Sequence, residues 1–307
     1  MRLIVIEGVT ASGKSDIAVK LALALNTEII SADSMQVYRG MDIGTGKIKK
    51  EEMKGVPHYM LDVADPKVPY DLSDYLPEAK KAIEKISDQG KIPIVCGGTW
   101  FYIQALEKDL DFTDESTDEE IRGKLMEKSV DELYEMLLDR DPESTKTIHK
   151  NNKKRVVRAL EYYEITGEPI SARNKEEKEK PPAYDLAKFI ISSDREIIYD
   201  RVEKRVDKMI EEGLLDEVRK LYDSGVTEDM RSMQGLGYKE FFPYFRGEKT
   251  LEECLYVLKR DTRHFAKRQL TYYRSEKNVE IINNNDGDID ACVKEILDKL
   301  ENKFEWI

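Results

Sequence analysis

The sequence predicts an α/β protein in which a helical domain is inserted into a doubly wound parallel sheet. Short β-branched strand candidates alternate with amphipathic helices over residues 1–113 and again over 185–307, which is the pattern of parallel strands joined by crossover helices. Between them, residues 114–184 are charged and helical in pattern and contain no strand candidate. The first strand candidate ends in a glycine-rich turn that opens a helix. We therefore expect a core in two parts and an insertion with a role of its own.

The glycine-rich turn carries a phosphate-loop motif. Its residues fit the pattern G-x-x-x-x-G-K-[ST] and are Gly8, Val9, Thr10, Ala11, Ser12, Gly13, Lys14 and Ser15. The glycines let successive backbone amides point inward at an anion, and the following helix adds the positive end of its dipole. Lys14 supplies a cation, and the Ser15 hydroxyl is placed to hold Mg²⁺. The motif predicts a P-loop NTPase-like core that binds a diphosphate or longer phosphate chain, whatever the phosphates are attached to.

The other elements follow from apolar periodicity and from helix start and stop signals. Further strands are expected at 28–31, 92–96, 188–192 and 279–282. Helices are expected at 14–25, 77–89, 100–106, 152–167, 197–210, 251–273 and 289–300. Residues 35–76 contain many Gly, Pro and Asp and are expected to form a long loop. Loops of this length are usually functional or poorly ordered.

Composition excludes several classes of protein. The 307 residues include three widely spaced cysteines, Cys96, Cys254 and Cys292, which predicts a reduced cytoplasmic protein without a metal cluster. No long apolar run is present, so neither a membrane span nor a signal peptide is expected. The net charge of −12 means that any nucleic-acid contact must depend on local basic patches. His58, His149 and His264 do not cluster in the sequence, which argues against a zinc site or a histidine-based triad.

Two polar residues follow strands that should neighbour the phosphate loop. Asp33 comes at the end of the second strand and Thr99 at the end of the third. Because the carboxyl ends of parallel strands share one crevice, both side chains should face the molecule that the loop binds. Asp33 is interpreted as a general base or hydrogen-bond acceptor, with a turn-capping role as the alternative. Asp62, at the end of another short apolar run, is the next carboxylate to consider.

Two basic clusters indicate a phosphate-backbone partner. The helix 251–273 carries Arg260, Arg263, Lys267 and, just beyond its end, Arg274 opposite its apolar side. The insertion contributes a second cluster, Lys150, Lys153, Lys154, Arg155 and Arg158. A charged helix face is normally only solvated, but a nearly uniform positive stripe in an acidic chain favours RNA binding.

With these features in view, the sequence resembles the bacterial tRNA dimethylallyltransferase family, also called tRNA isopentenyltransferases, over nearly its whole length. The resemblance rests on the blocks GVTASGKS, EIISADSMQVYRGMDIGTGK, GVPHYMLDVADP, PIVCGGT, NNKKRVVRALEYYEITG, RVEKRVDKMIEEGLLDEV, SMQGLGYKE and KRDTRHFAKRQLTYYR. The second, seventh and eighth blocks are more specific than the phosphate loop alone. Two departures stand out: Trp100 and Phe101 replace a smaller pair, and Val9 stands where the family usually has Pro.

The resemblance implies transfer of a dimethylallyl group from dimethylallyl diphosphate to the exocyclic amine of the adenine 3′ to the anticodon, with Mg²⁺ as cofactor. It implies that Asp33 accepts the proton of the amine, that Thr99 lines the tunnel where the substrates meet, and that Arg205, with Arg201 as a second candidate, helps to hold diphosphate. It further implies tRNA contacts by Asp33, Ser34, Met35, Gln36, Arg122, Lys154, Arg155, Val156, Val157 and Arg158. No protein partner is evident from the sequence, and a monomer is expected.

Three other functions are compatible with parts of this pattern. A small-molecule kinase would share the phosphate loop and an Asp near the second strand, but it has no need of the insertion or of a basic helix. An enzyme that prenylates free adenine nucleotides would share the core chemistry without the RNA contacts. A non-catalytic RNA-binding module would leave Asp33 and the intact phosphate loop without a role. The combination of features favours the tRNA-modifying enzyme.

Overall fold

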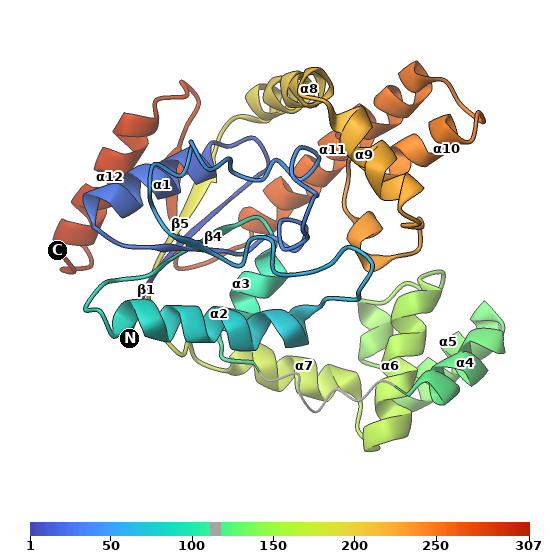
Figure 1. The fold of residues 1–307 in the computed structure, drawn as a ribbon. Coiled ribbons are helices and arrows are strands. Elements are labelled where there is room, and N and C mark those ends of the chain that lie inside the picture. The colour runs from blue at the N-terminus through green and yellow to red at the C-terminus, as the bar shows by residue number, and fades with distance from the viewer. Residues whose placement is uncertain (111–117) are drawn as a thin grey trace. The chain divides into compact units, whose positions relative to one another are not determined.

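The computed structural model describes residues 1–110 and 118–307, which form two compact units (Figure 1). Unit 1 comprises Met1–Glu107 and Tyr184–Ile307, and unit 2 comprises Lys108–Ala183. The boundary expected at residues 113–114 lies outside the described residues. Unit 1 is therefore built from two separate stretches of chain, which meet in one sheet.

Unit 1 contains a six-stranded, all-parallel sheet with strand order β3-β2-β4-β1-β5-β6, which confirms the predicted fold class. Its strands are β1 (Arg2–Gly8), β2 (Ile29–Ser31), β3 (His58–Tyr59), β4 (Ile94–Gly97), β5 (Asp185–Ser192) and β6 (Glu280–Asn283). Its helices are α1 (Lys14–Ala24), α2 (Leu72–Ser87), α3 (Trp100–Glu107), α8 (Arg195–Glu211), α9 (Leu214–Asp223), η2 (Arg231–Gln234), η3 (Lys239–Phe241), α10 (Phe242–Phe245), α11 (Leu251–Tyr273) and α12 (Ile289–Asn302).

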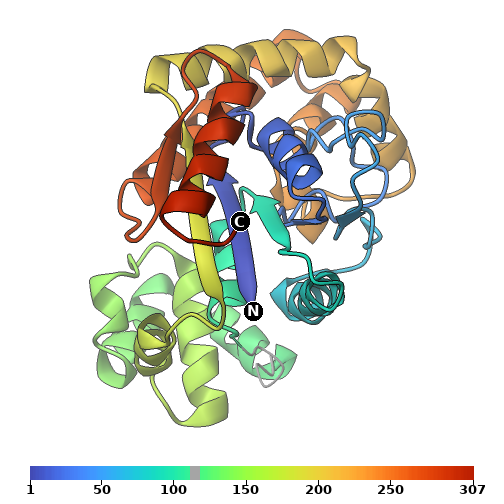
Figure 2. The same ribbon diagram turned by 90° about the vertical axis from the view of Figure 1, so that its left-hand side faces the viewer.

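Strand β5 alternates its side chains between two cores, one on each face of the sheet. Ile4 and Ile6 pack in a cluster with Ile17 of α1 and Ile296 of α12, so these two helices cover one face of the sheet. On the other face, Ile190 of β5 packs with α8 and α11 in a second cluster. Figure 2 shows the sheet with helices on both sides. This alternation is the period-two pattern of strands buried on both faces, and it places the carboxyl ends of β1, β2 and β4 side by side.

Helix α2 begins five residues before the predicted start at Pro77. Asp71 forms a capping box: its carboxylate accepts a hydrogen bond from the Ser73 amide at 2.9 Å, and Asp74 accepts one from the Asp71 amide, also at 2.9 Å. The two reciprocal bonds satisfy amides that would otherwise be unpaired at the helix start. Pro77 therefore lies inside the helix, and the expected loop 35–76 ends at residue 71.

Unit 2, where described, is helical. It contains α4 (Glu119–Glu127), α5 (Val130–Arg140), η1 (Ser144–Lys146), α6 (Lys153–Thr166) and α7 (Ile170–Glu179). Helix α6 matches the prediction closely, because the Asn152 side chain caps its start and Gly167 ends it in the left-handed conformation, with φ of 75°. Its buried side, which includes Leu160, packs with Leu133 and Leu137 of α5.

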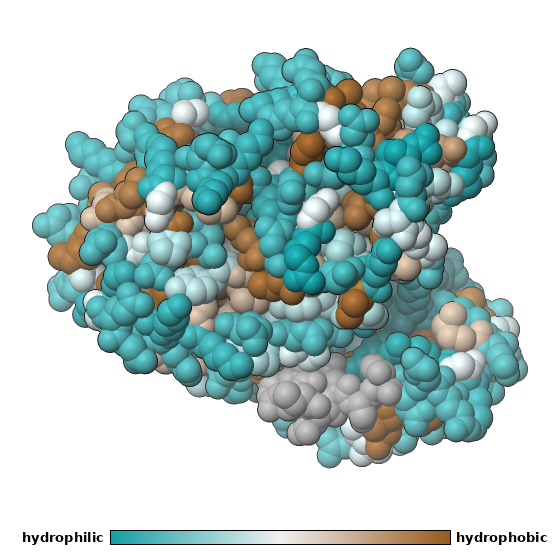
Figure 3. All heavy atoms as spheres, viewed as in Figure 1, coloured by the Kyte–Doolittle hydropathy of each residue, from teal (hydrophilic) through white to brown (hydrophobic). Residues whose placement is uncertain are grey.

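The surface is mainly polar, as the charged composition predicts. The face shown in Figure 3 is largely hydrophilic, with scattered hydrophobic side chains. Among the described residues, no helix combines the length and the apolar character that crossing a bilayer requires.

Candidate functional site

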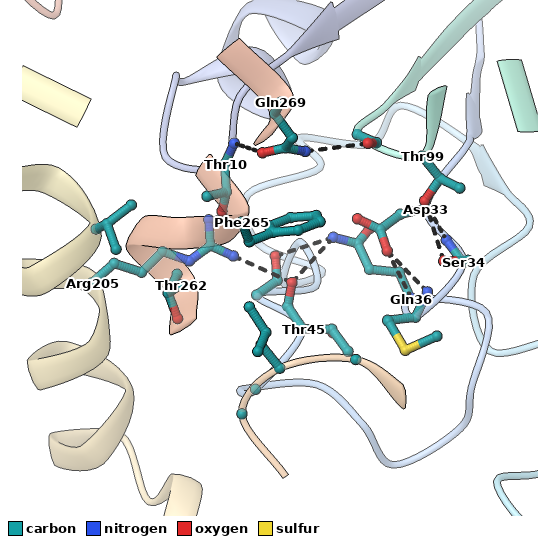
Figure 4. Close-up of a pocket in the computed structure, with 18 of the residues that line it drawn as sticks. Thr10, Asp33, Ser34, Gln36, Thr45, Thr99, Arg205, Thr262, Phe265 and Gln269 are labelled. Carbon is teal, nitrogen blue, oxygen red and sulfur yellow. Dashed lines mark hydrogen bonds between the residues drawn. The ribbon is translucent and has the colours of Figure 1, made fainter. Parts of the chain in front are cut away.

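A cavity of about 400 Å³ opens at the carboxyl ends of β1, β2 and β4 in unit 1. This volume is typical of small-molecule sites. Its walls come from seven separate segments of the chain, and they include Thr10, Lys14, Ser15, Asp33, Ser34, Met35, Gln36, Thr45, Thr99, Arg205, Thr262, Phe265, Arg268 and Gln269 (Figure 4). The cavity therefore brings the phosphate loop together with both strand-end residues that the sequence singled out.

The phosphate loop has the expected strand–turn–helix geometry. Gly13 has φ of 86°, a conformation that favours glycine, and α1 begins at the next residue. Ser15 lies in the first turn of α1 and lines both the main cavity and a smaller neighbouring one, which Ala11, Ser12 and Gly13 also line. Gly8 and Val9 line neither cavity, because Gly8 ends β1 and Val9 is buried in the core against Ile190. The part of the predicted motif that lines the cavities is thus residues 10–15.

Two cationic side chains face both cavities. Lys14 and Arg205 line both cavities, and desolvation lowers the pKa of each. Arg205 donates a hydrogen bond to the Thr45 carbonyl at 3.2 Å, and within the described ranges no carboxylate forms an ion pair with it. Partly desolvated cations without a carboxylate partner are a favourable setting for a multiply charged anion.

Arg201 lies elsewhere. Its guanidinium donates to the Asn284 and Asn285 carbonyls at 2.9 and 3.0 Å and to the Ser193 hydroxyl at 3.2 Å. It is not among the residues that line the cavity. Arg201 therefore joins the ends of β5 and β6, and of the two arginines implied by the resemblance only Arg205 lines the cavity.

Asp33 and Thr99 are brought together by the turn that follows β2. The Thr99 hydroxyl accepts a hydrogen bond from the Ser34 amide at 3.0 Å, and the Thr99 amide donates to the Ala32 carbonyl at 3.2 Å. This approach requires glycine at position 97, since a Cβ there would lie 2.1 Å from the Ala32 carbonyl oxygen. The residues flanking Asp33 are therefore fixed against the end of β4.

One oxygen of Asp33 serves the turn. Its Oδ1 accepts hydrogen bonds from the Met35 amide at 2.9 Å and from the Gln36 amide at 3.4 Å. The capping role considered as the alternative is thus present, and it is compatible with a second role, since a carboxylate offers further acceptor positions. In Figure 4 the Asp33 carboxyl group lies beside the Phe265 ring, which comes from α11.

Glu217 of α9 fixes the loop that closes the cavity. Its carboxylate accepts hydrogen bonds from the amides of Asp42, Ile43 and Gly44 at 2.9–3.1 Å and from the Tyr238 hydroxyl at 2.8 Å. Three successive amides turned toward one carboxylate form an anion-binding nest that the protein fills itself. The sequence gives no local signal for this long-range contact.

Asp62 belongs to a different part of the same loop. The buried ammonium group of Lys47 donates to Asp62 at 2.5 Å, to Asp42 at 2.7 Å and to the Tyr38 carbonyl at 2.8 Å. Asp62 is not among the residues that line the cavity. Its role is to hold Lys47, so Asp33 is the better candidate for a base.

Gln269 is a site residue that the sequence reasoning did not identify. Its side-chain oxygen accepts a hydrogen bond from the Thr10 amide at 2.9 Å, and its side-chain nitrogen donates to the Gly98 carbonyl at 3.2 Å (Figure 4). The available signal was a polar residue one position before Leu270, on the buried side of α11. Gln269 thus connects the phosphate loop to the residue that precedes Thr99.

Two of the four residues in the expected basic stripe of α11 have acidic partners. Arg263 forms an ion pair with Glu203 of α8, and Arg260 pairs with Asp261 at 2.7 Å. The partner of Arg260 is its neighbour in the chain, whereas Glu203 is distant in sequence from Arg263. The interpretation of the stripe as an RNA-binding surface stays a prediction. Arg268, which the sequence analysis passed over, lines the cavity instead.

The predicted RNA contacts of unit 2 separate into exposed and structural groups. Lys154 and Arg155 are exposed in the first turn of α6. Val156 and Val157 are buried in the core of the unit, so their side chains are not available for RNA. Lys153 donates to the Met126 and Lys128 carbonyls at 2.8 and 2.7 Å.

Two arginines of unit 2 share one buried carboxylate. Glu161 is inaccessible to solvent and pairs with Arg122 at 2.8 Å and with Arg158 at 3.3 Å. Both arginine side chains remain partly exposed, at 42% and 27%. Glu161 therefore positions both guanidinium groups near the surface of unit 2, which is compatible with a phosphate contact.

In the described part of the chain, the side chains that usually bind metal ions do not lie together in groups. Across residues 1–110 and 118–307, no three His, Cys, Asp or Glu side chains form a group that could hold a metal ion. The three cysteines are buried and reduced, and burial raises the pKa of the Cys96 thiol to about 12.

Comparison with known proteins gives a consistent assignment. A family model described as IPP transferase matches residues 36–276. The tRNA dimethylallyltransferase of Lachnoclostridium phytofermentans is 46% identical, with 99% of each chain covered, and that of Halalkalibacterium halodurans is 42% identical, with 99% and 98% covered.

Solved structures agree. The crystal structure of a full-length tRNA isopentenylpyrophosphate transferase from Bacillus halodurans has a TM-score of 0.76 and 41% identity, and covers 99% of this chain and 97% of that one. A eukaryotic dimethylallyltransferase acting on tRNA has a TM-score of 0.86 and 31% identity, and covers 99% of this chain and 79% of that one.

Proposed function

The chain belongs to the IPP transferase family, and we propose that it transfers the dimethylallyl group of dimethylallyl diphosphate to the exocyclic amine of the adenine 3′ to the anticodon in tRNA. The observation that carries the proposal is the shared cavity, in which Lys14 and Arg205 stand beside Asp33 and Thr99. The cations Lys14 and Arg205 suit a diphosphate. Asp33 and Thr99 offer hydrogen-bond acceptors and suit an amine. The family relatives, which are named for transfer to tRNA, favour this substrate over a free adenine nucleotide or a kinase substrate.

The reaction is a substitution at the first carbon of the donor. A bond forms between the adenine nitrogen and this carbon while the bond from the carbon to the diphosphate oxygen breaks, and the diphosphate leaves with the electron pair. Asp33 accepts the proton that the nitrogen loses, a form of help that contributes about 10²–10⁴-fold to rate. Lys14, Arg205 and the amides of residues 10–15 stabilise the charge that develops on the leaving oxygen.

Mg²⁺ suits the residues of the phosphate loop. Ser15 is exposed in the first turn of α1 and lines both cavities, and a single hydroxyl is adequate because Mg²⁺ usually keeps water and phosphate oxygens as its other ligands. When bound, the ion would neutralise charge on the diphosphate. Ser15 is the residue that would hold it.

The tRNA is proposed to contact both units. Asp33, Ser34, Met35 and Gln36 line the cavity of unit 1, where the adenine would enter. Lys154 and Arg155, with Arg122 and Arg158, provide positive charge on unit 2. Because unit 1 of one chain supplies all the residues of the cavity, a monomer suffices for the reaction, and a tRNA substrate implies work in the cytoplasm.

The decisive experiment is mass spectrometry of tRNA nucleosides after incubation with the protein, dimethylallyl diphosphate and Mg²⁺. We expect one adenosine per substrate tRNA to gain the mass of one dimethylallyl group in place of a hydrogen. Free AMP and a tRNA that lacks the adenine 3′ to the anticodon serve as competing acceptors. Prenylation of AMP in preference to tRNA would overturn the proposal in favour of the nucleotide enzyme.

A further inference from the structure

An exposed pair of aromatic side chains lies at the start of α3, directly after Thr99. Trp100 and Phe101 are 40% and 43% exposed, and their rings meet edge to face at 5.6 Å. Large aromatic side chains are normally buried, so adjacent exposed rings beside a functional cavity indicate a binding surface.

The Trp100 ring is held in place by stacked aromatic residues. It stacks on Tyr272 of α11 with ring centres 4.8 Å apart and planes 28° apart, and Tyr272 in turn meets the buried Tyr273 edge to face at 5.5 Å. The Tyr273 hydroxyl donates a hydrogen bond to the Gly8 carbonyl at 3.4 Å. An exposed ring anchored in this way to the start of the phosphate loop loses little conformational freedom when it binds a partner.

The pair also lies next to the cavity along α11. Phe265, Arg268, Gln269 and Tyr272 occupy positions i, i+3, i+4 and i+7 of this helix, which share one face. The first three line the cavity, and the Phe265 ring is seen there in Figure 4. The fourth supports Trp100. The Arg268 guanidinium lies 5.8 Å from the Phe265 ring centre and adds positive charge at this side of the cavity.

We propose that Trp100 and Phe101 form a stacking platform for a base of the tRNA anticodon loop that neighbours the reacting adenine. The inference rests on the proposed function. An adenine that enters the cavity must leave its stack, which leaves the adjacent base without a stacking partner. Exposed aromatic rings beside positive charge are the usual receptors for unstacked bases of single-stranded RNA. The occupant is therefore an RNA base, and not the prenyl chain or a second protein.

The first test uses the fluorescence of Trp100. The sequence contains two tryptophans, so Trp306→Phe leaves Trp100 as the single indole. Titration with an anticodon stem-loop should quench this emission, because a base stacks on the ring. The same stem-loop with an abasic site next to the target adenine should bind more weakly and quench less. Equal quenching by both RNAs would overturn the proposal.

The second test is a double-mutant cycle on stem-loop affinity. Trp100→Leu should weaken binding between about fivefold and 100-fold, the range for loss of one stacked base. The abasic RNA should lose a similar factor with the wild type and nothing further with Trp100→Leu, because both changes remove the same contact. Tyr256→Leu is the matched control, since Tyr256 is a 66% exposed aromatic residue of α11, and it should leave the affinity unchanged.

The outcomes separate the platform from the reaction itself. A wild-type protein that fails to prenylate tRNA would refute the proposed function. Normal wild-type transfer with unchanged affinity of Trp100→Leu would refute the platform alone. Additive losses in the cycle, or a Trp100→Leu defect confined to the KM of the prenyl donor, would also refute it and place Trp100 against another part of the substrates.

Discussion

Gln269 accepts a hydrogen bond from the Thr10 amide across 259 residues of sequence. The same side chain donates to the Gly98 carbonyl, next to the residue that contacts the Ser34 amide. The Gln269 side chain thus fixes the phosphate loop, which would bind the prenyl donor, relative to the end of β4, beside which the adenine would bind. Geometry of this kind matters because a displacement of about 1 Å can cost about 10²-fold in rate.

Replacement of Gln269 by Met should therefore lower kcat by about 10²-fold and raise the KM of the donor. It should also reduce the free energy of unfolding by about 1 kcal/mol, because two partly buried backbone groups lose their partner. Steady-state kinetics and urea unfolding measure the two effects. Gln234→Met is the matched control, since Gln234 lines the same cavity but bonds only to the Glu228 and Met230 carbonyls. Equal behaviour of the two variants would contradict the assignment.

Lys14→Ala should reduce transfer by at least about 10²-fold while tRNA affinity stays nearly unchanged, because Lys14 serves the diphosphate and not the RNA. Single-turnover transfer and stem-loop binding are the measurements. Lys20→Ala, which removes a partly exposed lysine of the same helix that pairs with Asp290, should affect neither. A parallel loss of tRNA affinity in Lys14→Ala would show that the two substrates do not occupy separate parts of the cavity.

Asp33→Asn separates the two roles of the Asp33 carboxylate. The amide oxygen can still accept the hydrogen bonds of the Met35 and Gln36 amides, so the turn should survive while the base is lost. We expect single-turnover transfer to fall by about 10²-fold or more. Asp33→Ala should be equally slow and also less stable by about 1 kcal/mol, the usual value of a lost cap. Near-normal transfer by Asp33→Asn would leave Asp33 as a turn residue only.

The affinity for tRNA should fall steeply with salt despite the acidic net charge. The log–log slope should be about −0.7 per phosphate neutralised in a single strand. Lys154→Ala and Arg155→Ala should each flatten the slope, because both side chains are exposed in α6. Lys153→Ala should instead lower the melting temperature, since Lys153 caps α4. Slopes that do not respond to Lys154 and Arg155 would move the RNA contact to another surface.

The environment of Glu7 predicts that the stability of the fold depends on pH. It shares the buried Lys188 with Glu107 and Glu276 at 2.8–3.2 Å. Against the effect of burial, these carboxylates raise the pKa of Lys188 and keep it charged. Burial raises the pKa of Glu7 from 4.5 to about 7. Between these values the folded chain binds more protons than the unfolded chain, so wild-type stability falls as pH rises through this window.

A variant without a titratable side chain at position 7 should not lose stability as the pH rises through this window. The free energy of unfolding of Glu7→Gln, relative to the wild type, should rise by on the order of 2 kcal/mol between pH 4.5 and pH 8. Urea unfolding at several pH values is the measurement, and a difference independent of pH would contradict the predicted shift.

Local signals in the sequence predicted much of the fold. The limits of α11 and the caps of α6 were predicted closely, because helix periodicity, Asn152 and Gly167 act over a few residues. The phosphate loop and the strand-end positions of Asp33 and Thr99 follow from the same short-range chemistry. The capping box at Asp71 is also a local signal. The preference of proline for the first turn of a helix favoured a start at Pro77 instead.

What could not be predicted depends on contacts between distant residues. The sequence of α11 alone indicates that its basic side chains are available for RNA. Packing against α8 places Glu203 beside Arg263, and no local signal shows this ion pair. Val156 and Val157 belong to a cluster whose burial depends on α5. The role of Gln269 requires the position of α11 relative to the phosphate loop, which no single segment specifies.

The clamp by Glu217 on residues 42–44 has a consequence for how the protein is made. A nascent chain that ends before residue 217 already contains the complete phosphate loop, but not the carboxylate that shapes the loop closing the cavity. Gln269, which holds the Thr10 amide, emerges from the ribosome later still. Contacts of such long sequence separation form late, after the local structure. Premature termination therefore yields an inactive fragment. The site is complete only when the last segments of the chain have been synthesised.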